Sequence, residues 1–97
     1  MAILIGSGRV SHRFTVTGDT NETVTSSTGE NIGPLSVCLT PGAGTALCEY
    51  RLHASDAWKS WPAGTVSAET TYRLNGAVQA LRFTATTAAA TVAISVE

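Results

Sequence analysis

The feature that most constrains this chain is a side-chain alternation with a period of two, which returns in segment after segment. Residues 10–16 show it most strictly, with Val10, His12, Phe14 and Val16 on one side and polar side chains on the other. A period of two is typical of a strand with one buried face, whereas the side chains of a helix repeat every ~3.6 residues. The pattern therefore predicts a fold made of strands.

Turn residues separate these segments at short intervals. Residues 18–21 and 28–31 combine Gly with Asp or Asn, and Asn75-Gly76 favours a tight hairpin turn. Roughly seven to nine short strands, with a turn about every 8–12 residues, are typical of a β-sandwich or a small barrel. We expect an all-β chain that forms one small antiparallel β-sandwich domain over residues 1–97, either a jelly roll or an immunoglobulin-like fold.

Strands that follow one another in the chain are expected to pair as hairpins. The expected pairs join residues 32–39 to 47–54, residues 70–74 to 77–81, and residues 81–83 to 92–94. In the second hairpin, which folds at Asn75-Gly76, Glu69 falls opposite Arg82, and opposite charges that face each other across two strands are favourable. Residues 54–62 break the alternation, and there we expect one helical turn.

The chain has two cysteines, Cys38 and Cys48, and the strand alternation indicates whether they can form a disulfide. When the apolar faces of the two segments that carry them pack together, Cys48 falls on the apolar side and Cys38 on the opposite side. A disulfide between the segments needs the opposite arrangement, so we expect two free thiols, in line with a reducing compartment. Two cysteines and two histidines at these positions also lack the spacing of a metal site.

Composition and charge exclude several classes of protein. Thr, Ala, Ser and Gly make up 47 of the 97 residues, while the net charge is −1. Disordered chains are poorer in apolar residues and richer in net charge, and coiled coils are rich in Lys and Glu. The Lys and Arg residues are scattered, so we expect no nucleic-acid partner. Because no apolar run is long enough for a secretion signal or a membrane span, we expect neither export nor a membrane partner.

Patterns of catalytic residues are sparse. The chain has no Gly-x-Ser-x-Gly motif, and Asp19 and Asp56 lie in expected turns, where Asp serves to cap the backbone. A pair of Glu residues arranged as in a glycosidase would need a larger cleft than this short chain can shape. We therefore expect a non-enzymatic protein without a cofactor or a metal site.

Trp58 and Trp61, three residues apart, are the most distinctive aromatic pair. They could form an aromatic platform that stacks on a sugar ring, as in a carbohydrate-binding module. The alternative is that one ring fills the sandwich and the other packs at its rim or at an interface with another protein, since Trp is enriched at interfaces. We favour the core or interface alternative and keep carbohydrate binding as the competing one.

The first residues form a second distinctive segment. Ile3, Leu4 and Ile5 stand before a Gly-Ser-Gly sequence, so residues 1–8 are either a first strand with its turn or an N-terminal arm that adds a strand to a neighbouring protein. The large apolar residues (Val, Ile, Leu, Phe, Trp and Tyr) total 25. Because this is few for so many strands, we expect part of the stability to come from contacts with other chains.

Three features occur together in this chain: an apolar start, a body rich in Thr, Ala, Gly and Ser, and an ending in which LRFTA at 81–85 is followed by TVAISV at 91–96. In these features the chain resembles the small all-β structural proteins of tailed-phage virions. The resemblance covers about the last third of the chain well and the rest only in composition.

The resemblance implies a protein that is made in the host cytoplasm and incorporated into the virion. Its implied role is that of a capsid decoration or cement protein, which binds the major capsid protein or other virion proteins and stabilises the shell, commonly as a homotrimer. A small tail, fibre or baseplate component is the alternative role. For contact with a partner, the sequence itself indicates Ile3, Leu4, Ile5, Trp58 and Trp61.

Overall fold

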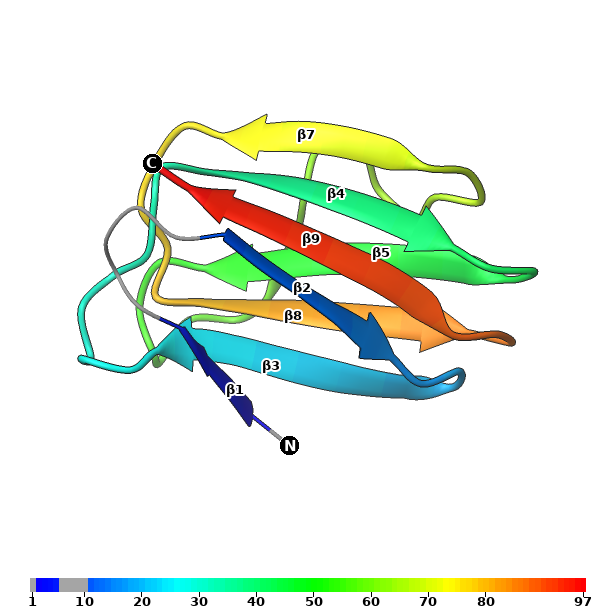
Figure 1. Cartoon of the computed structure of the whole chain (residues 1–97). Coiled ribbons are helices and arrows are strands. Elements are labelled where there is room, and N and C mark those ends of the chain that lie inside the picture. The colour runs from blue at the N-terminus through cyan, green and yellow to red at the C-terminus, as the bar shows by residue number, and fades with distance from the viewer. Residues whose placement is uncertain (1, 6–10) are drawn as a thin grey trace.

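The computed structural model describes residues 2–5 and 11–97, which fold into two β-sheets stacked face to face (Figure 1). The strands are β1 (Ala2–Ile5), β2 (Ser11–Val16), β3 (Thr20–Ser26), β4 (Leu35–Pro41), β5 (Thr45–Arg51), β6 (Lys59–Ser60), β7 (Thr70–Leu74), β8 (Ala80–Thr86) and β9 (Ala90–Val96). The described part of the chain contains no helix, and therefore none that could span a membrane. The expected all-β sandwich is confirmed.

The strand order identifies the sandwich as a jelly roll. One sheet has the order β1-β3-β8-β5-β6 and the other the order β2-β9-β4-β7. From β2 onward, the antiparallel pairs are β2 with β9, β3 with β8, β4 with β7, and β5 with β6. These pairs form one long hairpin, and rolling it up brings β4 beside β9 and β5 beside β8. Of the two expected architectures, the jelly roll is the one with this topology.

The three expected hairpins are wrong. The strands of each expected pair, β4 and β5, β7 and β8, and β8 and β9, lie in different sheets. Asn75-Gly76 therefore lies in a connection that crosses from one sheet to the other. The expected ion pair is wrong for the same reason, because Arg82 contacts Glu49 on β5 and Glu69 accepts a hydrogen bond from Thr40 Oγ1 at 3.0 Å. A strand buries its apolar face equally well when the next strand lies beside it or across the core.

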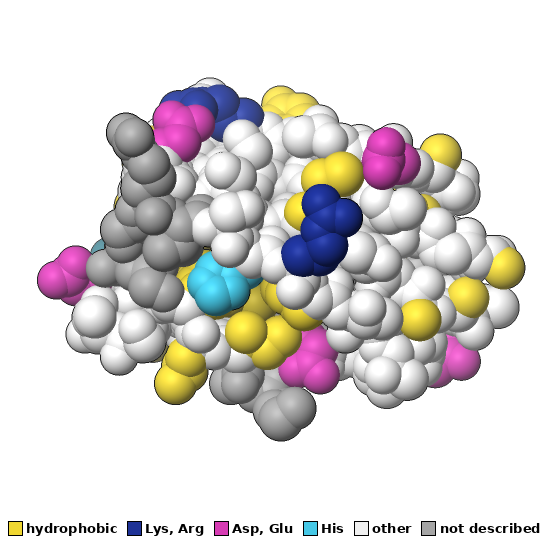
Figure 2. All heavy atoms as spheres, in the orientation of Figure 1, with side chains coloured by type: hydrophobic (Ala, Val, Ile, Leu, Met, Phe, Trp, Pro, Cys, Tyr) yellow, Lys and Arg dark blue, Asp and Glu magenta, His cyan; other side chains and the backbone are white. Residues whose placement is uncertain are grey.

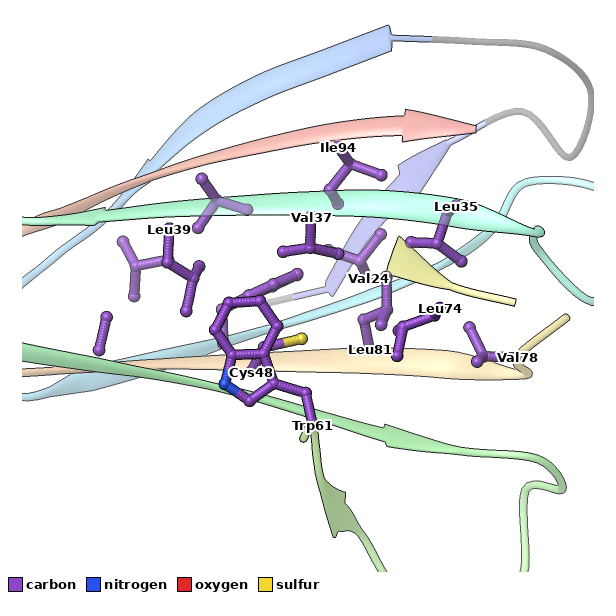
Figure 3. Close-up of a cluster of buried hydrophobic side chains, with 14 of the residues drawn as sticks. Val24, Leu35, Val37, Leu39, Cys48, Trp61, Leu74, Val78, Leu81 and Ile94 are labelled. Atoms are coloured by element: carbon purple, nitrogen blue, oxygen red, sulfur yellow. The ribbon is translucent and has the colours of Figure 1, made fainter. Parts of the chain in front are cut away.

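The core fills the space between the sheets with the faces that the alternation marks as apolar. Buried side chains come from every strand except β6 and from the segments that follow β3, β6 and β7. The largest are Trp61, Phe83, Ile5, Ile32, Leu35, Leu39, Leu81 and Ile94. Figure 3 shows Val37 and Leu39 of β4 facing Cys48 of β5 and Leu81 of β8 across this space. The sequence thus predicted the buried faces correctly even where it predicted the wrong neighbours.

Aromatic side chains close the two open sides of the sandwich. At the side formed by the edge strands β6 and β7, Trp61 and Tyr72 meet edge to face, with ring centroids 6.4 Å apart. At the side formed by β1 and β2, Phe14 meets Phe83 with centroids 5.7 Å apart, and Ile3 packs on the core. Pairs of this geometry contribute ~0.5–1.5 kcal/mol beyond their buried area.

Gly42 and Gly44, in the loop between β4 and β5, lie too close to neighbouring backbone atoms to carry a side chain. A Cβ atom on Gly44 would collide with the carbonyl oxygen of Thr86, and one on Gly42 would lie 2.9 Å from the carbonyl oxygen of Ala89. The loop therefore packs against the connection between β8 and β9, which lies at the same end of the sandwich. Glycine is required because any side chain would push the two connections apart.

Candidate interaction site

The N-terminal segment is a strand of the sandwich. β1 pairs in parallel with β3, with Ile3 opposite Val24 and Ile5 opposite Ser26. Ile5 is only 1% exposed and Ile3 packs against the core, whereas Leu4 points outward and is 62% exposed. Of the two alternatives for this segment, the structure shows the first strand. Met1 and residues 6–8 of the expected arm lie outside the described residues.

β1 is also the outermost strand of its sheet (Figure 1). An edge strand exposes a row of backbone N–H and C=O groups, and proteins commonly protect such edges with Lys, Pro or a charged inward residue. β1 consists of Ala, Ile, Leu and Ile and has none of these residues. Together with the exposed Leu4 side chain, this makes β1 an edge to which a strand of another protein can be added.

The two tryptophans lie on opposite sides of the five-stranded sheet. Trp61 is 1% exposed and points between the sheets beside Cys48, as Figure 3 shows, and its Nε1–H donates a hydrogen bond to the carbonyl oxygen of Gly64. Trp58 is half-buried on the outer face. The pair therefore forms no two-ring platform for a sugar, and Trp61 cannot contact a partner while the fold is intact.

The short strand β6 explains this separation. Ser60 pairs with Glu49 and shares its outward side, so Trp61 faces inward and Trp58 returns to the outer side. In a helix, side chains three residues apart share a face, but in an extended segment they face opposite ways. The expected helical turn at residues 54–62 is wrong, because the structure has no helix there.

Trp58 lies against two arginines on the outer face of the five-stranded sheet. The Cζ atoms of Arg51 and Arg82 lie 4.5 and 4.9 Å from the centroid of its ring. Glu49 Oε1 accepts hydrogen bonds from Arg82 Nε at 3.0 Å and Nη2 at 2.9 Å. Gln79 Oε1 accepts a hydrogen bond from Arg51 Nε at 2.7 Å. We call these five residues the Trp58 cluster.

The pairing of β5 with β8 assembles this cluster. Glu49 lies opposite Arg82, and Arg51, two residues further along β5, points to the same outer side. Each cation–π contact is worth ~0.5–1 kcal/mol at an exposed position, and together the contacts hold both guanidinium groups in place. The sequence could not indicate the cluster because β5 and β8 are far apart in the chain and were expected to pair with other strands.

A shallow apolar pocket of about 240 Å³ lies where β5 and β7 end. Its lining residues are Tyr50, Leu52, Leu74, Asn75, Gly76 and Val78. Leu52 follows Arg51 directly in the chain, Val78 precedes Gln79, and the backbone N–H of Gln79 donates to the carbonyl oxygen of Arg51 at 2.8 Å. The pocket and the cluster therefore both lie near the end of β5 but on different sides of it, because Arg51 points to the outer face and Tyr50 of the pocket to the opposite side.

The two thiols are free and differ in their surroundings. Cys48 is buried in the core and Cys38 is half-buried on the outer face of the four-stranded sheet, as the alternation predicted. Burial, together with the negative charge of Glu49, raises the pKa of the Cys48 thiol far above its usual range. Since the thiolate is the reactive form, Cys48 is expected to be inert in the folded protein.

Titration with a thiol reagent checks this difference. In the folded protein at pH 8, we expect one thiol, Cys38, to react readily, and both to react after unfolding in guanidinium chloride. A Cys38→Ser variant should then show no reactive thiol until it is unfolded. Two thiols that react equally fast in the folded protein would contradict the buried position of Cys48.

The His, Cys, Asp and Glu side chains that the structure describes are dispersed. No group of three or more of these side chains in the described part of the chain lies close enough together to hold a metal ion. Figure 2 shows charged side chains scattered over the visible face, without a patch of one sign. Comparison with protein-family models, with curated proteins and with solved structures gave no match to this chain.

Proposed function

We propose that this chain is a non-enzymatic structural protein of a virion, where it decorates a capsid and stabilises the shell. The observation that carries the proposal is the apolar edge strand β1, which contains no Lys, Pro or charged residue and has an exposed Leu4. The resemblance of the C-terminal third to small structural proteins of tailed phages supports the same role. The jelly roll is compatible with it, since viral capsid proteins are among those that use this architecture.

The edge strand would act by strand addition. A strand of the major capsid protein or of another virion protein would pair with the free edge of β1, while the Leu4 side chain enters an apolar contact. Full burial of a Leu side chain contributes ~1.5–3 kcal/mol. One short strand makes a small interface, so a homotrimer, which offers three such edges to a symmetric shell, would bind much more tightly through avidity.

Carbohydrate binding receives less support from the geometry. The expected platform needed two exposed rings, but Trp61 is in the core and Trp58 lies against two guanidinium groups. A role in the tail, fibre or baseplate would use the same edge strand and differs only in the partner. The location of the protein in the virion, on the shell or in the tail, therefore distinguishes the two roles.

The location of the protein in virions tests the proposal. Virions that encode this chain should contain it when purified particles are analysed by mass spectrometry, and cryo-electron microscopy should show it on the outer surface of the shell. Empty shells that lack it should gain thermal stability when the protein is added back, since binding stabilises the bound state. Absence from the virion would overturn the proposal, and presence only in the tail would support the alternative role.

A negative charge at Leu4, the exposed position of β1, tests partner binding without disturbing the core. We expect Leu4→Asp to reduce incorporation into particles by about tenfold or more, because a carboxylate would replace an apolar contact and ~1.4 kcal/mol corresponds to tenfold. Ser67→Asp adds the same charge at an exposed loop position and should incorporate normally. Quantitative mass spectrometry of the particles measures both. Equal incorporation of the two variants would exclude β1 as the contact strand.

A further inference from the structure

The backbone groups of Leu4 are directed to the free edge of β1. In a parallel pair of strands, every second residue directs both its N–H and its C=O group to the neighbouring strand. The N–H of Ser27 donates to the carbonyl oxygen of Ile5 at 2.7 Å, and Ile5 lies opposite Ser26 of β3. Ile3 and Ile5 therefore direct their backbone groups to β3. Leu4, which lies between them, directs its N–H and C=O groups to the side where a further strand could pair.

The surface around this edge is uncharged on the outer face of the sheet. β1 contains no charged residue, and Asn21, Thr23 and Thr25, which share the outward side of β3, are neutral. Like charges that face each other across two strands are destabilising. A second copy of β1 can therefore approach the first without bringing like charges together on this face.

A two-fold axis at Leu4 makes β1 complementary to itself. In an antiparallel pair centred there, Leu4 of one copy lies opposite Leu4 of the second copy, and Ile3 lies opposite Ile5. Opposite residues point to the same side of a sheet, so the inward Ile side chains stay inward and the two exposed Leu4 side chains meet on the outer face. The backbone groups that Leu4 directs to the free edge are those that the two copies would exchange. Backbone and side chains thus agree on one register.

The other edge of the five-stranded sheet explains why the association would end at two copies. There the sheet ends at β6, which has only two residues, one of them Lys59, and Pro62 follows it closely. Short strands, Lys and Pro are the means by which sheet edges avoid further pairing. A two-fold contact uses the same surface on both copies, so it leaves no β1 edge open. The expected assembly is therefore a closed dimer and not a fibre.

We infer that the free protein forms a two-fold dimer, in which the β1 strands of two copies pair antiparallel about Leu4 and join the five-stranded sheets. Two four-residue strands bury far less than the ~1,200–2,000 Å² of stable interfaces. The dissociation constant is therefore expected to be on the order of 100 µM. That this dimer covers β1 until a capsid strand replaces the second copy rests on the proposed function, but the dimer itself does not.

A cysteine at position 4 tests the register. In a Cys38→Ser background, Leu4→Cys should form a disulfide-linked dimer, because opposite residues of a hydrogen-bonded antiparallel pair have Cα atoms ~5.5 Å apart, within the range of disulfides. Thr25→Cys is the matched control, since it lies beside Leu4 on the same face but one strand further from the axis. Its two copies would have Cα atoms roughly 14 Å apart.

Non-reducing gel electrophoresis under a mild oxidant measures the rate at which each variant forms dimers. Each rate is divided by the rate at which that thiol reacts with a small thiol reagent, which corrects for exposure. We expect the corrected rate of Leu4→Cys to exceed that of Thr25→Cys about tenfold or more. Equal corrected rates would overturn the register and with it the dimer.

Sedimentation over a concentration series tests the dimer without a cross-link. The unmodified chain should change from monomer to dimer as its concentration approaches about 1 mM. Leu4→Asp should stay monomeric, because its two carboxylates would face each other at the axis, whereas Ser67→Asp should dimerise normally. Circular dichroism shows whether both variants are folded. An unmodified chain that stays monomeric, that forms larger oligomers, or that dimerises no better than Leu4→Asp would exclude this dimer.

The outcome for the dimer is separable from the outcome for the proposed function. If Leu4→Cys is cross-linked selectively but the chain is absent from virions, the dimer holds and the virion role fails. If the chain is present in virions but Leu4→Cys and Thr25→Cys behave alike, the virion role holds and the dimer fails.

Discussion

Replacing Trp61 with alanine is expected to lower the free energy of unfolding by about 3–5 kcal/mol, the range for a fully buried aromatic side chain. Trp61 is 1% exposed, closes the side of the sandwich at Tyr72 and donates a hydrogen bond to Gly64. Its removal would leave a cavity that the edge strands β6 and β7 could fill only in part. Domains of this size are stable by ~5–15 kcal/mol in total, so the variant should be near the limit of folding.

Trp58→Ala is the matched control, because it removes the same side chain three residues away. Trp58 is half-buried, and its loss removes two cation–π contacts worth ~0.5–1 kcal/mol each. We therefore expect a loss of about 1–2 kcal/mol. Urea unfolding followed by circular dichroism compares the two variants without relying on tryptophan fluorescence. Similar losses in both would contradict the placement of Trp61 in the core and Trp58 outside it.

Removal of β1 is expected to have the second largest effect on stability. Deleting residues 2–5 takes the fully buried Ile5 and the partly buried Ile3 out of the core, and loss of one buried Ile side chain alone costs ~2–5 kcal/mol. The deletion also turns β3 into the edge of its sheet, with its backbone groups exposed. We expect a protein that unfolds at lower urea concentration and associates through β3.

Single substitutions divide this effect into its parts. Ile5→Ala should account for most of the loss in stability, whereas Leu4→Ala should change it by less than about 0.5 kcal/mol, because Leu4 is exposed. Urea unfolding and size-exclusion chromatography measure stability and association. If Leu4→Ala were as destabilising as Ile5→Ala, the assignment of the inward and outward sides of β1 would be wrong. A loss of particle binding after deletion of residues 2–8 would not distinguish folding from contact, so Leu4→Asp is the informative variant.

The sequence predicted the strands and their buried faces because these depend on local periodicity. The inward positions of β9, Val92, Ile94 and Val96, are buried as the alternation indicates. The opposite sides taken by Cys38 and Cys48 follow from the same period of two, and so does the absence of a disulfide between them. A resemblance in the last third of the chain suggested a role but indicated no single functional residue.

The period of two determined by itself that this chain forms strands and which of their sides are apolar, and the turn spacing added the expectation of a sandwich or a small barrel. Only the tertiary structure decided which strands are neighbours, because an apolar face is buried equally well beside the next strand or across the core from it. Each of the three expected hairpins proved to be a crossing between the two sheets. The pairing of β5 with β8 then brought Arg51 and Arg82 to Trp58, and no local pattern could have predicted that contact.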